Sequence, residues 1–244
     1  MQAVNITPSA GHHLACAAIT ALTVAWLWLA LRLPARALAG LLGWQALMGG
    51  LALTGYFLRF DQPWRVLPTV GLGVGAATWL ACRPWHTDTG HWLAACPPWA
   101  LAALHSFRLP LEWLLYSLFL HGVIGRQMTF SGYNFDIFIG LSAPIVALLL
   151  HRCGQARWAR QMAVAWNLLG LLLLLNIVVI AVLSIPFSFQ VFTTGPGNRF
   201  IAGLPFVWLP CLLVPLALWS HLCSLRLLLR ANHPHLKATL APSS

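Results

Sequence analysis

Charged residues are scarce in this sequence, and acidic residues are the scarcest of them. Only 7% of the 244 residues are charged and only four are Asp or Glu, while 59% are hydrophobic. Soluble domains carry about 25% charged and about 45–50% apolar residues. The composition therefore excludes an ordinary soluble domain and indicates a chain that folds in lipid.

Several classes of site are excluded because their residues are missing. The six cysteines include no C-x-x-C pair, which argues against a disulfide framework. The only lysine, Lys237, lies in the C-terminal tail, so the chain lacks the lysine that a retinal Schiff base requires. No Walker loop, nucleophile elbow or H-E-x-x-H motif is present. We expect no cofactor and no bound metal; a metal between Cys82 and Cys96, or a haem held by His105 and His221, is less favoured.

Apolar segments of about 20 residues, the length that crosses a bilayer, recur along the whole chain. We predict an all-α, polytopic transmembrane helix bundle that forms a single domain over residues 1–244. The first 13 residues contain no basic residue, so they lack the charged region of a signal peptide, and we expect the first span to remain. The sequence predicts about seven spans, at residues 14–31, 37–58, 66–82, 98–124, 135–150, 162–185 and 204–225.

The basic residues predict orientation rather than nucleic-acid binding. The net charge is +10, but Lys and Arg stand singly or in small groups between apolar segments. An outside N-terminus leaves four of them on the outer side, namely Arg59, Arg65, Arg126 and Arg199. The inner side then holds nine, namely Arg32, Arg36, Arg83, Arg152, Arg157, Arg160, Arg226, Arg230 and Lys237. Because cytoplasmic loops are enriched in Lys and Arg, we predict N-out/C-in topology.

The fourth predicted span contains ionisable residues at helical spacing. His105, Arg108, Glu112 and Tyr116 are three, four and four residues apart, so a helix presents them on one face. Charged groups inside a membrane cost about 2.5–3.5 kcal/mol each on insertion scales and therefore have a partner or a function. We consider two interpretations. Arg108 and Glu112 form a structural ion pair, or they line a polar pocket in which Arg108 binds an anionic or carbonyl group and Glu112 or His105 handles protons.

Two aromatic and polar connections, residues 125–136 and 185–200, fall on the predicted outer side and could cover the bundle. Asp136, at the end of the first, is expected to pair with Arg126 or to cap the following helix. Asn167 and Asn176 lie on opposite faces of the sixth span, so each is expected to bond a different neighbour. Pro205, Pro210 and Pro215 predict a kinked seventh span; these three recur every five residues.

Five sequence blocks resemble a family of uncharacterised bacterial integral membrane proteins. They are FRLPLEW, MTFSGYNFDIFIGLSAP, WNLLGLLLLLNIV, PFSFQVF and PFVWLPCLLVPLALWSHLCSL, within roughly residues 104–230. The resemblance implies a bacterial inner-membrane protein and no particular activity. It directs attention to Arg108, Glu112, Asn134, Asp136, Asn167 and Asn176.

Our leading hypothesis is that the protein binds or transports a small molecule in a polar pocket around Arg108 and Glu112. The ligand-binding residues are then His105, Arg108, Glu112, Tyr116, Asn134, Asp136, Asn167 and Asn176; no catalytic residue is assigned. The alternatives are an intramembrane enzyme that acts on a lipid or isoprenoid, and a structural or accessory membrane subunit. The expected partners are membrane lipid and a small-molecule ligand, not nucleic acid.

Overall fold

A computed structural model describes residues 7–193 and 195–232, and its described part is all-helical, as predicted. Lys237, used in the orientation count, lies outside these residues. The α-helices are α1 (Ala10–Leu29), α2 (Ala35–Leu53), α3 (Leu67–Ala81), α4 (Asp88–Ala95), α5 (Pro98–Leu104), α6 (Arg108–Leu120), α7 (Ile137–Cys153), α8 (Arg157–Leu183) and α9 (Val214–Asn232). Short 3-10 turns are η1 (Tyr56–Leu58), η2 (Pro63–Arg65), η3 (His105–Phe107), η4 (Arg126–Met128) and η5 (Phe200–Ala202); a π-helical turn, η6 (Leu209–Leu213), leads into α9.

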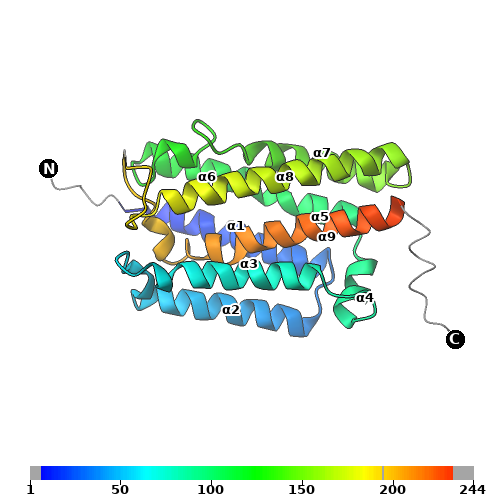
Figure 1. Ribbon diagram of the computed structural model, residues 1–244, viewed down its shortest axis with the longest axis horizontal. Helices are drawn as coiled ribbons and strands as arrows, with labels where there is room; N and C mark the ends of the chain where they lie inside the picture. Colours follow the sequence, from blue (N-terminus) through cyan, green and yellow to red (C-terminus); the bar gives the residue numbers. More distant parts are fainter. Residues whose placement is uncertain (1–6, 194, 233–244) are drawn as a thin grey trace.

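The α-helices other than α4 run along the long axis of the molecule (Figure 1). The short helix α4 lies at one end, beyond α3. Helix α9 packs against α8, α3 and α5, and this places the last described helix in the interior of the bundle. Side chains of α9 can therefore contact α3 on one side and α5 and α8 on the other.

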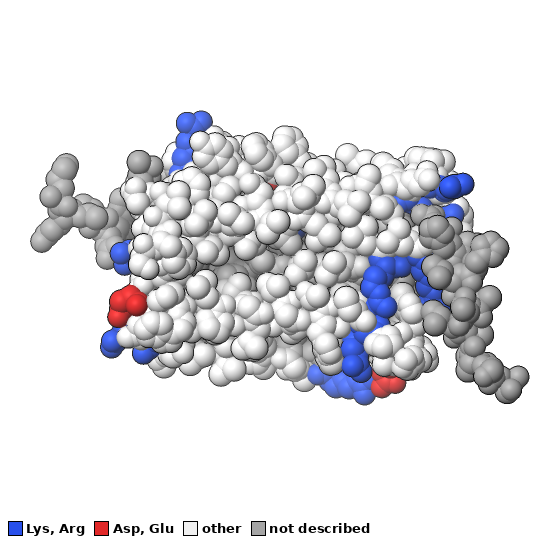
Figure 2. Space-filling model, viewed as in Figure 1, with Lys and Arg blue, Asp and Glu red and all other residues white. Residues whose placement is uncertain are grey.

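Within the described residues, three helices are long and apolar enough to cross a membrane by length and composition. They are Ala10–Leu29, Arg157–Leu183 and Leu209–Ala231. Helix α7 is apolar but has only 17 residues. Figure 2 shows arginine side chains at the two ends of the long axis, with an almost uncharged surface between them. These features are those of a helical membrane protein.

The α-helices other than α4 fall on the predicted segments, but two of those segments are less regular than predicted. The single helix expected over residues 98–124 is interrupted by η3, so α5 and α6 are separate helices. Pro110 lacks the N–H that would bond to the carbonyl of Ser106, which favours a break there. The predicted kinked helix over residues 204–225 begins only at Leu209, with the π-helical turn, so Pro205 precedes it.

Candidate functional site

A buried polar network lies where η3 and α6 meet α7, α8 and α9. Of the four residues predicted to share a helix face, His105, Arg108 and Glu112 are buried, with at most 2% of their surface exposed. Tyr116 is only half-buried, and its ring stacks on that of Phe130 with centroids 4.7 Å apart. The first three residues of the predicted face therefore point into the bundle, whereas the fourth, Tyr116, lies outside the network.

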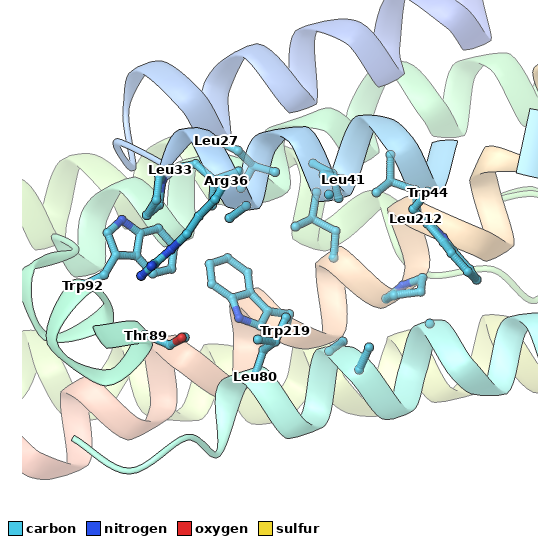
Figure 3. A pocket seen from close by; sticks show the side chains of 18 of the residues that line it. Leu27, Leu33, Arg36, Leu41, Trp44, Leu80, Thr89, Trp92, Leu212 and Trp219 are labelled. Carbon is cyan, nitrogen blue, oxygen red and sulfur yellow. The ribbon is translucent and has the colours of Figure 1, made fainter. Parts of the chain in front are cut away.

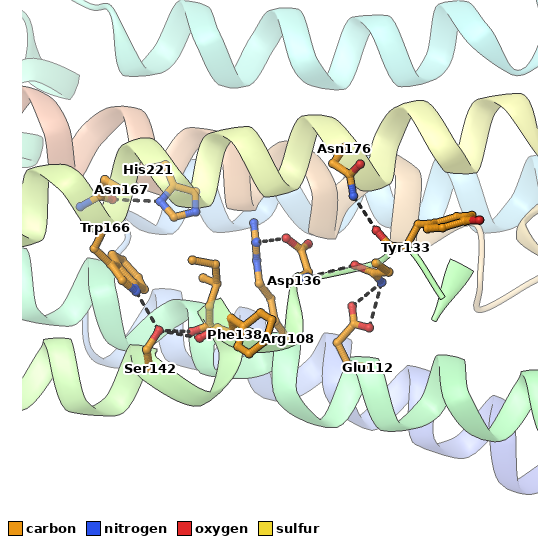
Figure 4. A network of polar contacts seen from close by, with 12 residues as sticks. Arg108, Glu112, Tyr133, Asp136, Phe138, Ser142, Trp166, Asn167, Asn176 and His221 are labelled. Atoms are coloured by element: carbon orange, nitrogen blue, oxygen red, sulfur yellow. Dashed lines mark hydrogen bonds and ion pairs between the residues drawn. The ribbon is translucent and has the colours of Figure 1, made fainter. Parts of the chain in front are cut away.

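Arg108 pairs with Asp136, and this corrects the predicted pairing with Glu112. Its Nη1 atom lies 2.7 Å from Oδ1 of Asp136 (Figure 4). Glu112 instead accepts two hydrogen bonds from Nδ2 of Asn134, each 2.8 Å long. The loop before α7 thus supplies separate partners for Arg108 and Glu112, and helical spacing within α6 does not determine either pair.

Asp136 also departs from both roles predicted for it. It precedes the first residue of α7, but its side chain makes no capping hydrogen bond. Arg126 donates from Nε to the carbonyl of Ser131 rather than to Asp136. Because the loop folds back toward α6, Asp136 reaches the buried Arg108, where an unpaired guanidinium would be costly.

Two histidines form the second half of the network. The rings of His105 and His221 stack with centroids 3.8 Å apart and planes inclined by 23°. Nδ1 of His221 lies 2.9 Å from Oδ1 of Asn167, so this nitrogen donates its hydrogen and a neutral ring presents Nε2 as an acceptor. Asn167 also donates to Ser224 Oγ and to the carbonyl of Ala163.

This stacking does not fit the haem alternative. Two histidines that ligate one haem iron lie on opposite faces of the porphyrin, whereas His105 and His221 lie directly against each other. In the part of the chain that the structure describes, no group of three or more His, Cys, Asp or Glu could hold a metal ion. The six cysteines are free thiols.

Four buried nitrogen atoms of the network have no hydrogen-bond partner among the described residues. They are Nδ1 and Nε2 of His105, Nη2 of Arg108 and Nε2 of His221. His221 lies between Asn167 and Arg108 in Figure 4. Because a buried polar atom without a partner costs about 1–3 kcal/mol, four within one network indicate a binding function or a reserve of strain.

Two glycines allow the helices to approach the network closely. A Cβ atom at Gly140 of α7 would lie 2.6 Å from the backbone nitrogen of Leu109, the residue after Arg108. A Cβ atom at Gly170 of α8 would overlap the imidazole ring of His221. Glycine at both positions therefore sets the spacing of α7 and α8 around the network.

Asn176 is separate from the network, although it was predicted with the others. It donates from Nδ2 to the carbonyl of Tyr133 at 2.7 Å, in the connection between α6 and α7. Asn167 and Asn176 thus bond different neighbours, as expected. The two connections predicted to lie on one side do meet: the rings of Tyr133 and Phe192 lie with centroids 6.4 Å apart.

Sequence reasoning missed Ser224, Trp166 and Ser142 as members of the network. Nε1 of Trp166 donates to Ser142 Oγ at 2.8 Å, and its indole ring lies at 79° to the ring of His105, with centroids 5.5 Å apart. A signal was available in the last helix. Ser220, His221 and Ser224 follow one another at helical spacing within an apolar segment, which predicts a polar stripe facing a partner.

Two large cavities flank the network. One, of about 740 Å³, lies between α1 and the α5–α6 segment and is lined by Leu104, Ser106 and Phe107, the neighbours of His105 and Arg108. The other, of about 650 Å³, lies between α2, α3 and α9 and is lined mainly by apolar side chains. Neither is lined by the network residues themselves.

The fold and this site define a helical protein of membrane type with a buried polar core. The chain belongs to a family defined by a domain of unknown function, DUF8737, which matches residues 66–229. The match contains the entire buried network and leaves out α1 and α2. The expectation of a family without a known activity is confirmed. No curated protein and no solved structure matches the chain.

Proposed function

We propose that the chain is a single-domain, multi-pass protein of the bacterial inner membrane, with about seven spans and its N-terminus outside. The arrangement of helices along one axis supports this topology, as do the charged ends in Figure 2. The connections proposed to lie inside carry eight arginines in the described chain, and those proposed to lie outside carry four. The sequence resemblance to bacterial membrane proteins supports the location.

The function proposed for the network is to bind or transport a small molecule that carries an anionic or carbonyl oxygen. The unpartnered nitrogens of Arg108 and His105 support this role. Nη2 of Arg108 is a permanent donor for such an oxygen, and His105 donates from either ring nitrogen according to its tautomer, whereas Nε2 of His221 accepts a hydrogen. Glu112, Asn134, Asp136 and Asn167 hold these groups in place, while Tyr116 and Asn176 lie at the outer edge of the proposed site.

A route to the site is supported by the break between α5 and α6. The 740 Å³ cavity is lined by residues on both sides of His105, so one turn of chain separates this cavity from the network. A short 3-10 segment within a longer helix often marks a hinge. Movement of η3 would then connect the cavity to Arg108.

A structural role is the competing candidate, and the hydrogen bonds of Asp136 and Glu112 favour it. Both carboxyl groups already have partners, and their bonds tie α6 to the start of α7. In an accessory subunit, the network would specify the packing of these helices and would bind nothing.

The test is the thermal stability of the full-length protein in detergent with formate, acetate, bicarbonate or inorganic phosphate. A ligand at about 100 times its Kd stabilises the folded state by about 2.7 kcal/mol. We expect one of these oxyanions to stabilise the wild type and to have no effect on a folded Arg108→Leu/Asp136→Leu variant. Arg152→Leu, which removes an exposed arginine at the end of α7, is the control and should respond like the wild type. The absence of any shift in the wild type would favour the structural role.

A further inference from the structure

The second cavity has a polar mouth and an apolar interior. It lies between α2, α3 and α9 and encloses about 650 Å³, within the range of about 300–1,000 Å³ that is usual for ligand pockets. Leucines, alanines and Trp219 form most of its walls. The end of the cavity farthest from this mouth is lined by Trp44, whose Nε1 donates to the carbonyl of Cys211 at 2.9 Å.

The mouth lies where α2 begins and α4 approaches it (Figure 3). Nη2 of Arg36 is 2.8 Å from Oδ2 of Asp88, and the two side chains are 75% and 79% exposed. Thr89 lines the same end. Trp92 is fixed beside them because its Nε1 donates to the carbonyl of Leu31 at 3.0 Å. A cation, an anion and a hydroxyl therefore stand together at the entrance of an apolar groove.

The depth of the groove corresponds to one leaflet of a membrane. Arg36 and Trp44 are eight residues apart on α2, which is about 12 Å at a rise of 1.5 Å per residue. Half of the hydrocarbon core of a bilayer is about 15 Å thick. Because α2 starts at the end that we assign to the inside, the groove opens toward the inner leaflet.

We propose that this groove binds one glycerophospholipid of the inner leaflet, whose headgroup carries a primary ammonium beyond its phosphate. An acyl chain fills the apolar part down to Trp44. The phosphate lies on Arg36, and the ammonium lies on Asp88. The lipid site is independent of the site proposed around Arg108.

Charge complementarity selects this headgroup over the others. The Arg36–Asp88 pair is neutral as a whole, so a zwitterionic headgroup can exchange partners with both residues. An anionic headgroup without an ammonium would place its phosphate beside an unmatched Asp88. A trimethylated ammonium has the right charge but no N–H to donate, so it loses the charge-assisted hydrogen bond to the carboxylate.

Two glycines of α2 provide a matched pair of variants for the apolar part. Gly40 lines the groove and Gly43 does not, and a Cβ atom at either position would meet no atom within 4 Å. A phenylalanine at position 40 would extend into the groove without a clash of its Cβ, whereas position 43 lies outside the set of residues that line it. We expect Gly40→Phe to abolish retention of the lipid and Gly43→Phe to retain it as the wild type does.

The headgroup is tested by native mass spectrometry of the full-length protein, equilibrated with equal amounts of phosphatidylethanolamine, phosphatidylcholine and phosphatidylglycerol. We expect the wild type to retain about two to five times as much phosphatidylethanolamine as either of the other lipids. This ratio corresponds to the energy of one exposed ion pair. Asp88→Asn should remove this preference. Arg36→Gln should weaken retention of all three lipids.

Equal retention of the three lipids by the wild type would overturn the proposal, as would a Gly40→Phe variant that retains lipid as well as Gly43→Phe. If Gly40→Phe does not fold, Asp88→Asn decides the question alone, because Asp88 is exposed in a short helix at one end of the molecule. Preference for phosphatidylethanolamine that persists in Asp88→Asn would contradict the assigned headgroup.

Discussion

Asn134 donates from one nitrogen atom to both carboxylate oxygens of Glu112, at 2.8 Å each. Its own Oδ1 accepts the backbone N–H of Asp136 at 3.1 Å. One amide thus fixes the carboxyl group of α6 and the residue that precedes α7. The position of Asp136 opposite Arg108 therefore depends on Asn134, whose side chain carries no charge.

We expect Asn134→Ala to destabilise the protein by about 1–3 kcal/mol, because it leaves the buried Glu112 without its donor. Asn134→Ala/Glu112→Leu should recover part of this loss, since the group that needs a donor is then gone. Unfolding of both variants in mixed micelles measures the difference. Equal stability of Asn134→Ala and the wild type would show that Glu112 needs no donor.

Removal of one partner of the Arg108–Asp136 pair should be more severe. Arg108→Leu and Asp136→Leu each leave a buried charge, and such changes cost about 3–5 kcal/mol. The double variant should be considerably more stable than either single variant, because an apolar replacement of a buried pair is often neutral. Additive losses in this double-mutant cycle would show that the two side chains do not interact energetically.

The two asparagines of α8 should differ in their contribution to stability. Asn167 bonds His221, Ser224 and Ala163 in the buried core, so Asn167→Ala is expected to cost about 1–3 kcal/mol. Asn176 donates one bond at the edge of the bundle, so Asn176→Ala should cost about 0.6 kcal/mol, the average for such bonds in membranes. Denaturation of both variants under one set of conditions tests the order.

Gly140→Ala should destabilise the protein because the new Cβ meets the backbone of Leu109, which no rotamer change can move away. The expected cost is about 1–3 kcal/mol, as for other overpacked sites. Gly75→Ala in α3 is the matched control, since its Cβ would have no neighbour within 4 Å. A melting temperature of Gly140→Ala equal to that of the control would contradict the close approach of α7 and α6.

The pKa of Asp88 is held below its ordinary value because Arg36 donates a hydrogen bond to the carboxylate and adds its positive charge. Arg36→Gln should therefore raise this pKa toward the ordinary value. The pair forms fully above the ordinary pKa of aspartate and is lost as the pH falls through the lowered one. A ¹³C NMR titration of labelled aspartate resolves the change, because the chain has only three aspartates and Asp88→Asn identifies the signal.

Composition and periodicity were sufficient to predict a helical chain of membrane type and to place the α-helices other than α4. The apolar segments determine these features directly, because lipid requires that backbone groups bond within each segment. Helical spacing also placed His105, Arg108 and Glu112 on one buried face. These features depend on residues that are close in the sequence.

The partners within the site could not be predicted in the same way. Spacing within α6 favoured Glu112 as the partner of Arg108, but Asp136 lies 28 residues away and is brought back by the loop before α7. The stacking of His105 on His221 likewise depends on how α9 packs in the interior. Such pairs follow from the path of loops and the packing of helices, which local patterns do not specify.

The interior position of α9 has a consequence for the order of assembly during synthesis. Asn167 is made 54 residues before His221, a delay of about 3–11 s at about 5–20 residues per second. Its Nδ2 atom can bond to the carbonyl of Ala163 on its own helix as soon as that helix forms. Oδ1 of Asn167 has its partner only after His221 is made, so the hydrogen bonds of the polar core are complete only when α9, the last described helix, has packed.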